Sequence, residues 1–221
     1  MKLSENTVNI LKNYATINPS LLVNTGNVLS TMSPTKAMYA YATVEENFPR
    51  QFAIYELSKF LGVMSLFKEP ELNFDEQAVT IVSGRQTVKY TYTNPNNIVA
   101  PDPNKKIAFP TADIEFSISQ EELQRVVRAA GVLQLKEAAV FGNAQNITMT
   151  ATDSKNPTAD VFSVEVGETD KTFAMYFDIH DIIKLLPNDY NVKITSKGLS
   201  QFSSNNIVYY VGIKANSTFN G

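Results

Sequence analysis

The chain of 221 residues contains no cysteine, a single histidine and nine widely spaced glycines. Without cysteine it has no disulfide, no thiolate nucleophile and no zinc-finger site, which suits a protein of the cytoplasm. The two nearest glycines, Gly212 and Gly221, are nine residues apart, so the sequence has neither a phosphate-binding P-loop nor a dinucleotide-binding fingerprint. These absences exclude thiol enzymes and the commonest nucleotide-binding motifs.

Long apolar runs are also absent. No stretch of about 18 apolar residues is present to span a bilayer, and Asn and Glu interrupt the apolar residues near the N-terminus, where a secretion signal would lie. We therefore expect no association with a membrane. With 43% hydrophobic and 19% charged residues, the composition is typical of a soluble globular chain of one large or two ordinary domains.

Basic residues are slightly fewer than acidic residues. Nineteen lysines and arginines against 22 aspartates and glutamates give a net charge of −3 and a pI near 5.3. Proteins that bind DNA by neutralising phosphates are usually basic, so the composition alone argues against nucleic acid. Any contact with DNA has to come from a local cluster.

Such a cluster lies in SQEELQRVVRAAGVLQ, residues 119–134. Ser119 is a good N-cap and Glu122 completes a capping box, which predicts a helix. The apolar residues recur at helical spacing and predict one buried stripe: Leu123, Val126, Val127 and Ala130. Arg125 and Arg128 lie opposite this stripe, so both are expected to face outward. An ordinary solvated pair of Arg125 with Glu121 one turn earlier is the alternative explanation for the first of them.

The chain repeats itself. FAIYELSKFL, residues 52–61, and FDIHDIIKLL, residues 177–186, align without a gap on the pattern F-x-I-x-x-[LI]-x-K-[FL]-L. Each copy predicts a short strand that runs into a helix. In both copies the lysine, Lys59 or Lys184, is expected on the outer face of that helix.

The first helix of each half repeats more loosely. Ser4 begins a helix in the way that Ser119 does, although the periodicity places Asn9 and Asn13 further outward than Lys12. Three strand-like runs follow the second helix of each half, and a proline-rich segment separates the halves. We expect an N-terminal domain over 1–93, a connector over 94–110 and a C-terminal domain over 111–221. Two helices cannot cover both faces of so many strands, so mostly antiparallel sheets with helices on one side are predicted.

The most enzyme-like cluster is Asp178, His180 and Asp181. A small hydrolase that uses these three residues is one alternative function. Acidic residues at a helix start also satisfy free N–H groups, and the other copy of the repeat has Ala53, Tyr55 and Glu56 at the same places. We therefore favour helix capping and expect no enzyme activity, no metal site and no cofactor. A phage structural or assembly protein is the other alternative, since β-rich, cysteine-free chains suit virions.

The order and spacing of these features resemble the sliding clamps of DNA replication, most of all the processivity clamps of T-even-type bacteriophages. The matching stretches are MKLSENTVNILKNYATIN, the connector NNIVAPDPNKKIAFPTAD with the helix that follows it, and the closing YYVGIKA. The resemblance implies an α+β fold of two tandem DNA-clamp domains, each with antiparallel sheets outside and two helices on the inner face. It further implies a homotrimeric, six-domain ring around duplex DNA, which tethers a DNA polymerase and is loaded by an ATP-dependent loader in the cytoplasm of the infected bacterium.

The same resemblance implies roles for particular residues. Those expected to face DNA are Lys12, Lys59, Arg125, Arg128 and Lys184. Those expected to bind partner peptides are Ile98, Val99, Tyr210, Gly212 and Ile213, although Tyr210 and Ile213 fit the core of a closing strand equally well. Two alternating strands are expected to pair between subunits: Thr87, Val88, Lys89, Tyr90, Thr91 and Tyr92 with Val161, Phe162, Ser163, Val164, Glu165 and Val166.

Overall fold

The computed structural model describes residues 1–102 and 107–220, which fall into two compact units, Met1–Ile107 and Ala108–Gly221. The division lies inside the connector expected over 94–110. Part of that connector, with Pro103, is outside the described residues. Among the described residues, no helix is both long enough and apolar enough to cross a membrane.

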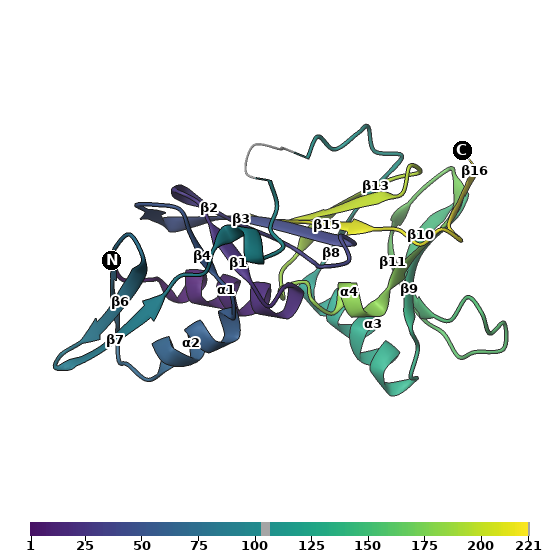
Figure 1. The fold of residues 1–221 in the computed structure, drawn as a ribbon. Coiled ribbons are helices and arrows are strands. Elements are labelled where there is room, and N and C mark those ends of the chain that lie inside the picture. Colours follow the sequence, from purple (N-terminus) through teal and green to yellow (C-terminus); the bar gives the residue numbers. More distant parts are fainter. Residues whose placement is uncertain (103–106, 221) are drawn as a thin grey trace. The chain divides into compact units, whose positions relative to one another are not determined.

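Unit 1 contains two helices that lie side by side and several short antiparallel sheets (Figure 1). Its elements are α1 (Glu5–Ile17), β1 (Leu21–Val23), β2 (Gly26–Met32), β3 (Met38–Phe48), β4 (Phe52–Ile54), α2 (Leu57–Ser65), β5 (Glu71–Phe74), β6 (Ala78–Ser83), β7 (Gln86–Thr91) and the 3₁₀ helix η1 (Pro95–Asn97). Strand β1 pairs with β4, β2 with β3, and β5-β6-β7 form a three-stranded sheet. All of these pairings are antiparallel, as the sequence predicted.

Unit 2 repeats the plan with longer strands. Its elements are β8 (Ile114–Ile118), α3 (Gln120–Val132), β9 (Glu137–Asn143), β10 (Asn146–Thr152), β11 (Phe162–Glu168), β12 (Thr172–Asp178), α4 (Ile179–Ile182), β13 (Tyr190–Thr195), β14 (Leu199–Ser203), β15 (Ile207–Gly212) and β16 (Thr218–Asn220). One sheet has the order β11-β10-β9-β12-β16, and β15-β14-β13-β8 form another run of antiparallel pairs. Helices α3 and α4 lie on one face of the first sheet (Figure 1). The prediction of helices on one side of antiparallel sheets is confirmed.

The first helix of each unit is capped at its N-terminus, but by different means. In α3 the capping box forms as predicted, with the Ser119 backbone N–H donating to Glu122 at 2.9 Å. In helix α1 the Ser4 hydroxyl accepts from the Thr7 N–H at 3.2 Å, but Thr7 stands where α3 has Glu122, so the capping box is not complete within the helix. Its Ser4 N–H donates instead to Glu46 on β3, and the Thr7 hydroxyl donates to the same carboxylate at 2.5 Å. Burial raises the pKa of the Glu46 carboxyl, but the hydrogen bonds from Thr7 and Ser4 outweigh burial and lower it overall.

The buried stripe of α3 is slightly narrower than predicted. Leu123, Val126 and Ala130 are buried, whereas Val127 is only half-buried at the margin of the stripe. On α1 the outward placement of Asn13 was wrong, because this side chain is 9% exposed while Lys12 is exposed. Packing of α1 against its unit sets this rotation, and the sequence period alone did not resolve it.

The second helix of unit 2 is much shorter than predicted. Helix α4 ends at Ile182, and the chain continues in tight turns in which Leu185 N–H donates to the carbonyl of Ile182 at 3.1 Å. Pro187 prevents the helix from running through Leu186, because a proline pushes the residue before it out of the helical region and its ring clashes with the carbonyl four residues earlier. The predicted helix through Leu186 was therefore wrong.

A buried carboxylate ties two loops of unit 2 to its sheet. Glu137, at the start of β9, is 2% exposed; Lys214 donates to it, and the Ser154 backbone N–H donates at 2.6 Å. Burial raises the pKa of the Glu137 carboxyl, but the hydrogen bonds and charge of these partners outweigh burial and lower it. Asn216 adds a hydrogen bond of 3.0 Å to the Ser154 hydroxyl. The segments after β10 and after β15 are thus fixed together.

Candidate nucleic-acid interface

The two arginines of α3 are exposed on the side opposite its buried stripe. The Arg125 side chain is 59% exposed and donates to Glu121 at 2.5 Å, and Arg128 donates to Gln124 at 3.1 Å. The ordinary pairing expected for Arg125 is therefore present. Solvated pairs of this kind contribute only about 0.3–0.5 kcal/mol, so either guanidinium can exchange its helix partner for a phosphate.

Unit 1 presents lysines in a comparable way. Lys59 on α2 is 68% exposed, with Glu56 at 3.8 Å, and Lys12 on α1 is exposed. Both point away from buried residues of their own helix, Met64 on α2 and Tyr14 on α1. Each helix of unit 1 thus offers a positive charge to the solvent.

Lys184 does not match Lys59 as the repeat predicted. Because α4 ends at Ile182, Lys184 lies in the turn that follows, with a side chain only 26% exposed. Its ammonium donates to Asp181 at 3.2 Å. The equivalence of the two lysines on an outer helix face was therefore wrong, and the charge of Lys184 is partly neutralised.

Lys136 is an exposed cation that the sequence analysis missed. It lies between α3 and β9, and its carbonyl accepts from the Ile179 N–H at the start of α4 at 3.1 Å. Its side chain therefore starts from the junction of the two helices of unit 2. No periodic signal could have found it, since it belongs to neither helix.

The enzyme-like trio serves structural roles. The Asp178 carboxylate caps α4 by accepting from the His180 N–H at 2.9 Å, and Asp181 pairs with Lys184. His180 is exposed. Within the described residues no group of three or more histidine or acidic side chains is placed to hold a metal ion.

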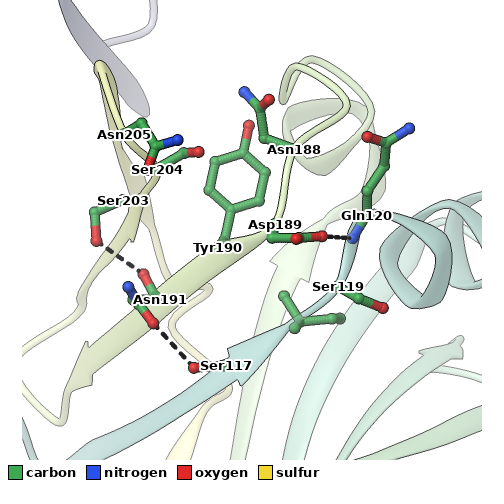
Figure 2. Close-up of a pocket in the computed structure, with 11 residues that line it drawn as sticks. Ser117, Ser119, Gln120, Asn188, Asp189, Tyr190, Asn191, Ser203, Ser204 and Asn205 are labelled. Atoms are coloured by element: carbon green, nitrogen blue, oxygen red, sulfur yellow. Dashed lines mark hydrogen bonds between the residues drawn. The ribbon is translucent and has the colours of Figure 1, made fainter.

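A hollow of about 690 Å³ in unit 2 is lined mainly by serine and asparagine (Figure 2). Asp189 is the one carboxylate among its lining residues, and it accepts from the backbone N–H of Gln120 at 2.7 Å. Asn191 accepts from the hydroxyl of Ser117 at 2.9 Å. Hydrogen bonds within the wall therefore use these polar groups. The Ser119 hydroxyl of the lining belongs to the cap of α3, where it donates to Glu122 at 2.7 Å.

The expected peptide-binding residues belong to both units: Ile98 and Val99 to unit 1, and Tyr210, Gly212 and Ile213 to unit 2. In unit 1 Val99 is 43% exposed, its carbonyl accepts from Asn18 at 2.8 Å, and Ile98 is half-buried. In unit 2 Tyr210 is 6% exposed and stacks on Phe109 with ring centroids 6.1 Å apart. Tyr210 is therefore a core residue, which favours the alternative interpretation of that position.

The closing segment of unit 2 continues past β15. Gly212 ends that strand, and Ile213, half-buried, donates from its N–H to Gly198 at 3.1 Å. A second hollow of about 240 Å³ is lined by Ile213 with Met175, Lys197 and Lys214. The segment thus combines an apolar side chain with an open surface.

The two strands expected to pair between subunits lie at sheet edges. Strand β7 is the last strand of β5-β6-β7, and β11 is the first of β11-β10-β9-β12-β16. Along both strands, half-buried and exposed side chains alternate as predicted. Val88, Tyr90 and Tyr92 are half-buried while their neighbours are exposed, and the same alternation holds for Phe162, Val164 and Val166 against Val161, Ser163 and Glu165.

Comparison with known proteins gives two family models that together match most of the chain. The model described as DNA polymerase processivity factor matches residues 2–100, and the model described as gp45 sliding clamp, C terminal, matches residues 115–215. The chain is 33% identical over 221 residues to the sliding clamp of Vibrio phage KVP40, covering 97% of this chain and 100% of the relative. It is 29% identical over 228 residues to the sliding clamp of Enterobacteria phage T4, covering 99% of each.

A solved structure is similar as well. The structure of A. fulgidus PCNA with the bound C-terminal region of FEN-1 matches with a TM-score of 0.73 over 98% of both chains, at 9% sequence identity. At that identity the likeness establishes a shared fold and nothing finer.

Proposed function

We infer that this chain, which belongs to the sliding-clamp family of DNA polymerase processivity factors, closes as a ring of three copies around duplex DNA. The chain has the DNA clamp fold and functions as a bacteriophage sliding clamp that makes a DNA polymerase processive. Proteins of this family are non-enzymatic accessory proteins. We propose that this chain likewise catalyses no reaction and that a separate ATP-dependent loader opens the ring.

The observation that supports encirclement is the set of exposed cations on the helices of a chain with net charge −3. Lys12, Lys59, Arg125 and Arg128 lie on helix faces opposite the buried stripes. Repeated around a ring, they would make a thin positive lining inside an acidic exterior. Contacts to phosphate carry no sequence information, so such a lining holds DNA weakly and lets the ring slide.

Lys184 belongs to the proposed lining as a weaker member, because Asp181 shares its charge. Lys136 joins it from the junction of α3 and α4. The lining of unit 2 would therefore rest mainly on Arg125 and Arg128.

The proposed seam of the ring pairs β7 of one copy with β11 of the next. A head-to-tail contact is heterologous, and with two units per chain three copies close a circle of six. Each strand is six or seven residues long, and its alternate side chains are already half-buried against its own unit. Pairing would therefore extend two sheets without exposing their cores.

We propose that short peptides of the polymerase and the loader bind the connector residues Ile98 and Val99 and the closing residues Tyr210, Gly212 and Ile213. The exposure of Val99 and the open surface beside Ile213 support this assignment. Tyr210 would act as a rigid aromatic wall rather than as an exposed contact. A. fulgidus PCNA, which has the same fold, is the partner of a C-terminal region of FEN-1, and this chain is proposed to capture peptides of that kind.

The chain acts inside the host cell during infection, as a phage replication clamp does. We propose the bacterial cytoplasm as its compartment, where the DNA and the polymerase are found.

The ring is tested by mass in solution. Light scattering across micromolar concentrations is expected to give about 73.5 kDa, three times the chain mass of 24.5 kDa. A linear duplex with both ends blocked should then retain the loaded protein longer than the same duplex with open ends, because a ring leaves only by sliding off an end. A stable monomer or dimer, or equal retention on the two duplexes, contradicts encirclement.

A further inference from the structure

The three-stranded sheet and the five-stranded sheet each have one long strand edge that is uncovered. In the three-stranded sheet, Leu72 of β5 exchanges hydrogen bonds with Met1 at 2.7 and 2.9 Å, so that edge is covered. In the five-stranded sheet, β16 has only three residues. In the described part of the chain this leaves β7 and β11 as the long free edges of these two sheets.

The two edges carry opposite charge. Residues 83–93, which contain β7, include two basic residues, Arg85 and Lys89, and no acidic one. Residues 160–170, which contain β11, include four acidic residues and no basic one: Asp160, Glu165, Glu168 and Asp170. All six side chains are exposed, and none has an ion-pair partner among the described residues. In a chain with nearly balanced charge, the free edges of these two sheets thus carry opposite charge.

The alternation of each strand decides where these charges point. On β7, Tyr90 packs on Phe60 of α2 with ring centroids 5.2 Å apart, so Lys89 points to the opposite, helix-free face. On β11, Val164 lies opposite the buried Met149 of β10, so Glu165 points to the helix-free face of its own sheet. When two such edges pair with their helices on the same side, Lys89 and Glu165 share one face of the joined sheet.

We propose that charge decides which edge pairs with which, so that Arg85 and Lys89 of β7 select the acidic β11 of a second copy and reject another β7. The proposal rests on the ring of the proposed function and adds the residues that enforce its head-to-tail order. Opposite charges on neighbouring strands favour pairing, and like charges oppose it. A two-fold dimer through β7 and β7, or through β11 and β11, would bring like charges together. The charge pattern therefore opposes the two isologous contacts and favours the heterologous, head-to-tail contact from which a ring is built.

The test reverses each edge separately and then both together. Arg85→Glu with Lys89→Glu makes both edges acidic. Glu165→Lys with Glu168→Lys makes strand β11 itself basic, with Asp160 and Asp170 left outside the strand, so that both paired strands then carry lysine. Each double variant is expected to raise the concentration of half-assembly roughly tenfold or more, measured by light scattering at low salt. The fourfold variant restores complementary edges and is expected to assemble like the wild type. Far-UV circular dichroism verifies folding, which exposed positions should not disturb.

A mixture of wild-type and fourfold-variant chains tests the charge sorting more directly than either variant alone. Wild-type and fourfold-variant chains should each form their own rings and should not exchange, since every mixed seam places like charges on the paired strands β7 and β11. Mixed rings are detected by capture through a tag carried on one chain only. Lys36→Glu with Lys197→Glu, two exposed turn lysines away from the edges, is the control for net charge and should assemble normally.

The outcomes separate the two proposals. A wild-type chain that is not a trimer overturns the ring and this inference with it. A trimeric wild type whose double variants assemble unchanged, or whose fourfold variant stays monomeric while folded, overturns the charge sorting alone. Free exchange between wild-type and fourfold-variant rings overturns it as well.

Discussion

Replacing Glu137 with glutamine tests whether the buried ion pair of unit 2 holds its loops in place. The glutamine keeps the shape of the side chain and can still accept the 2.6 Å hydrogen bond from the Ser154 N–H. It loses the negative charge that faces Lys214. The substitution therefore removes the electrostatic part of the interaction with little change in packing.

The magnitude follows from the exposure of the two partners. Removing one partner of a buried ion pair typically costs about 3–5 kcal/mol, because the other is left as an unpaired buried charge. Here the side chain of Glu137 is 3% exposed and that of Lys214 is 35% exposed. Without its partner the ammonium can turn toward water, so Glu137→Gln should cost about 2 kcal/mol. Lys214→Met leaves the buried carboxylate of Glu137 without its ion-pair partner and should lower the free energy of unfolding by more, about 3–4 kcal/mol.

The effect of Glu137→Gln should depend on pH in a defined direction. The folded-state pKa of the Glu137 carboxyl is below its ordinary value of 4.5. A lowered folded pKa contributes stability that is present above the unfolded pKa and is lost as the pH falls through the folded pKa. The difference between wild type and Glu137→Gln should therefore be full at about pH 7 and should shrink steadily in acid below about pH 4.5.

Urea unfolding followed by circular dichroism at one fixed protein concentration measures these differences, with Glu45→Gln as a control at an exposed glutamate. Equal stability of wild type and Glu137→Gln at neutral pH would refute the reasoning. A difference that persists undiminished in acid would show that packing, and not charge, carries the effect.

Two further predictions concern the proposed DNA and peptide surfaces. Charge reversal of Lys59, Arg125 and Arg128 together should leave folding and assembly intact but shorten retention on end-blocked duplex. It should also reduce the salt dependence of that retention by roughly 0.9 in the logarithmic slope for each phosphate that the variant no longer neutralises. Ile98→Asp with Val99→Asp should weaken binding of a C-terminal polymerase peptide by tenfold or more in a fluorescence titration, roughly the effect of removing one apolar anchor.

Each of these variants has a matched control. Lys155→Glu reverses an exposed lysine in the loop between β10 and β11 and should leave retention unchanged. Val28→Asp alters a valine that is 46% exposed, against 43% for Val99, and should leave peptide affinity unchanged. Unchanged retention after the triple reversal would contradict the proposed DNA surface. Equal affinity losses from Val28→Asp and from the connector variant would contradict the proposed peptide surface.

The features that the sequence predicted correctly depend only on residues that lie close together in the sequence. Ser119 and Glu122 stand three residues apart and form the predicted capping box. The alternation of residues 87–92 and 161–166 gave two strands with the predicted half-buried faces. Antiparallel sheets with helices on one side followed from the order of such short patterns. The roles of these residues in DNA binding and assembly stay predictions.

The features that the sequence missed depend on packing or on a distant partner. The repeat aligned Lys184 with Lys59, yet Pro187 shortens α4 and Asp181 takes up the lysine charge. Asn13 was placed outward by the period, but the packing of α1 buries it. Lys136 lies in an irregular segment where no period exists. Identical residues at equivalent positions of a repeat therefore can differ in secondary structure and in exposure.

The two ways of capping the first helices have a consequence for the order in which the units fold. Helix α3 contains both bonds of its capping box within four residues, so the box can form as soon as the helix nucleates, and Asp189 adds its bond to the Gln120 N–H from a distant part of the chain. In helix α1 the bond from the Thr7 N–H to the Ser4 hydroxyl is local, but the Ser4 N–H is accepted by Glu46, 42 residues away, so the chain has to close that loop before the cap is complete. Contacts between distant residues form late in folding because their entropy cost comes first. The stable start of α1 thus arrives together with β3, whereas α3 can act as an early local nucleus for the unit that follows it.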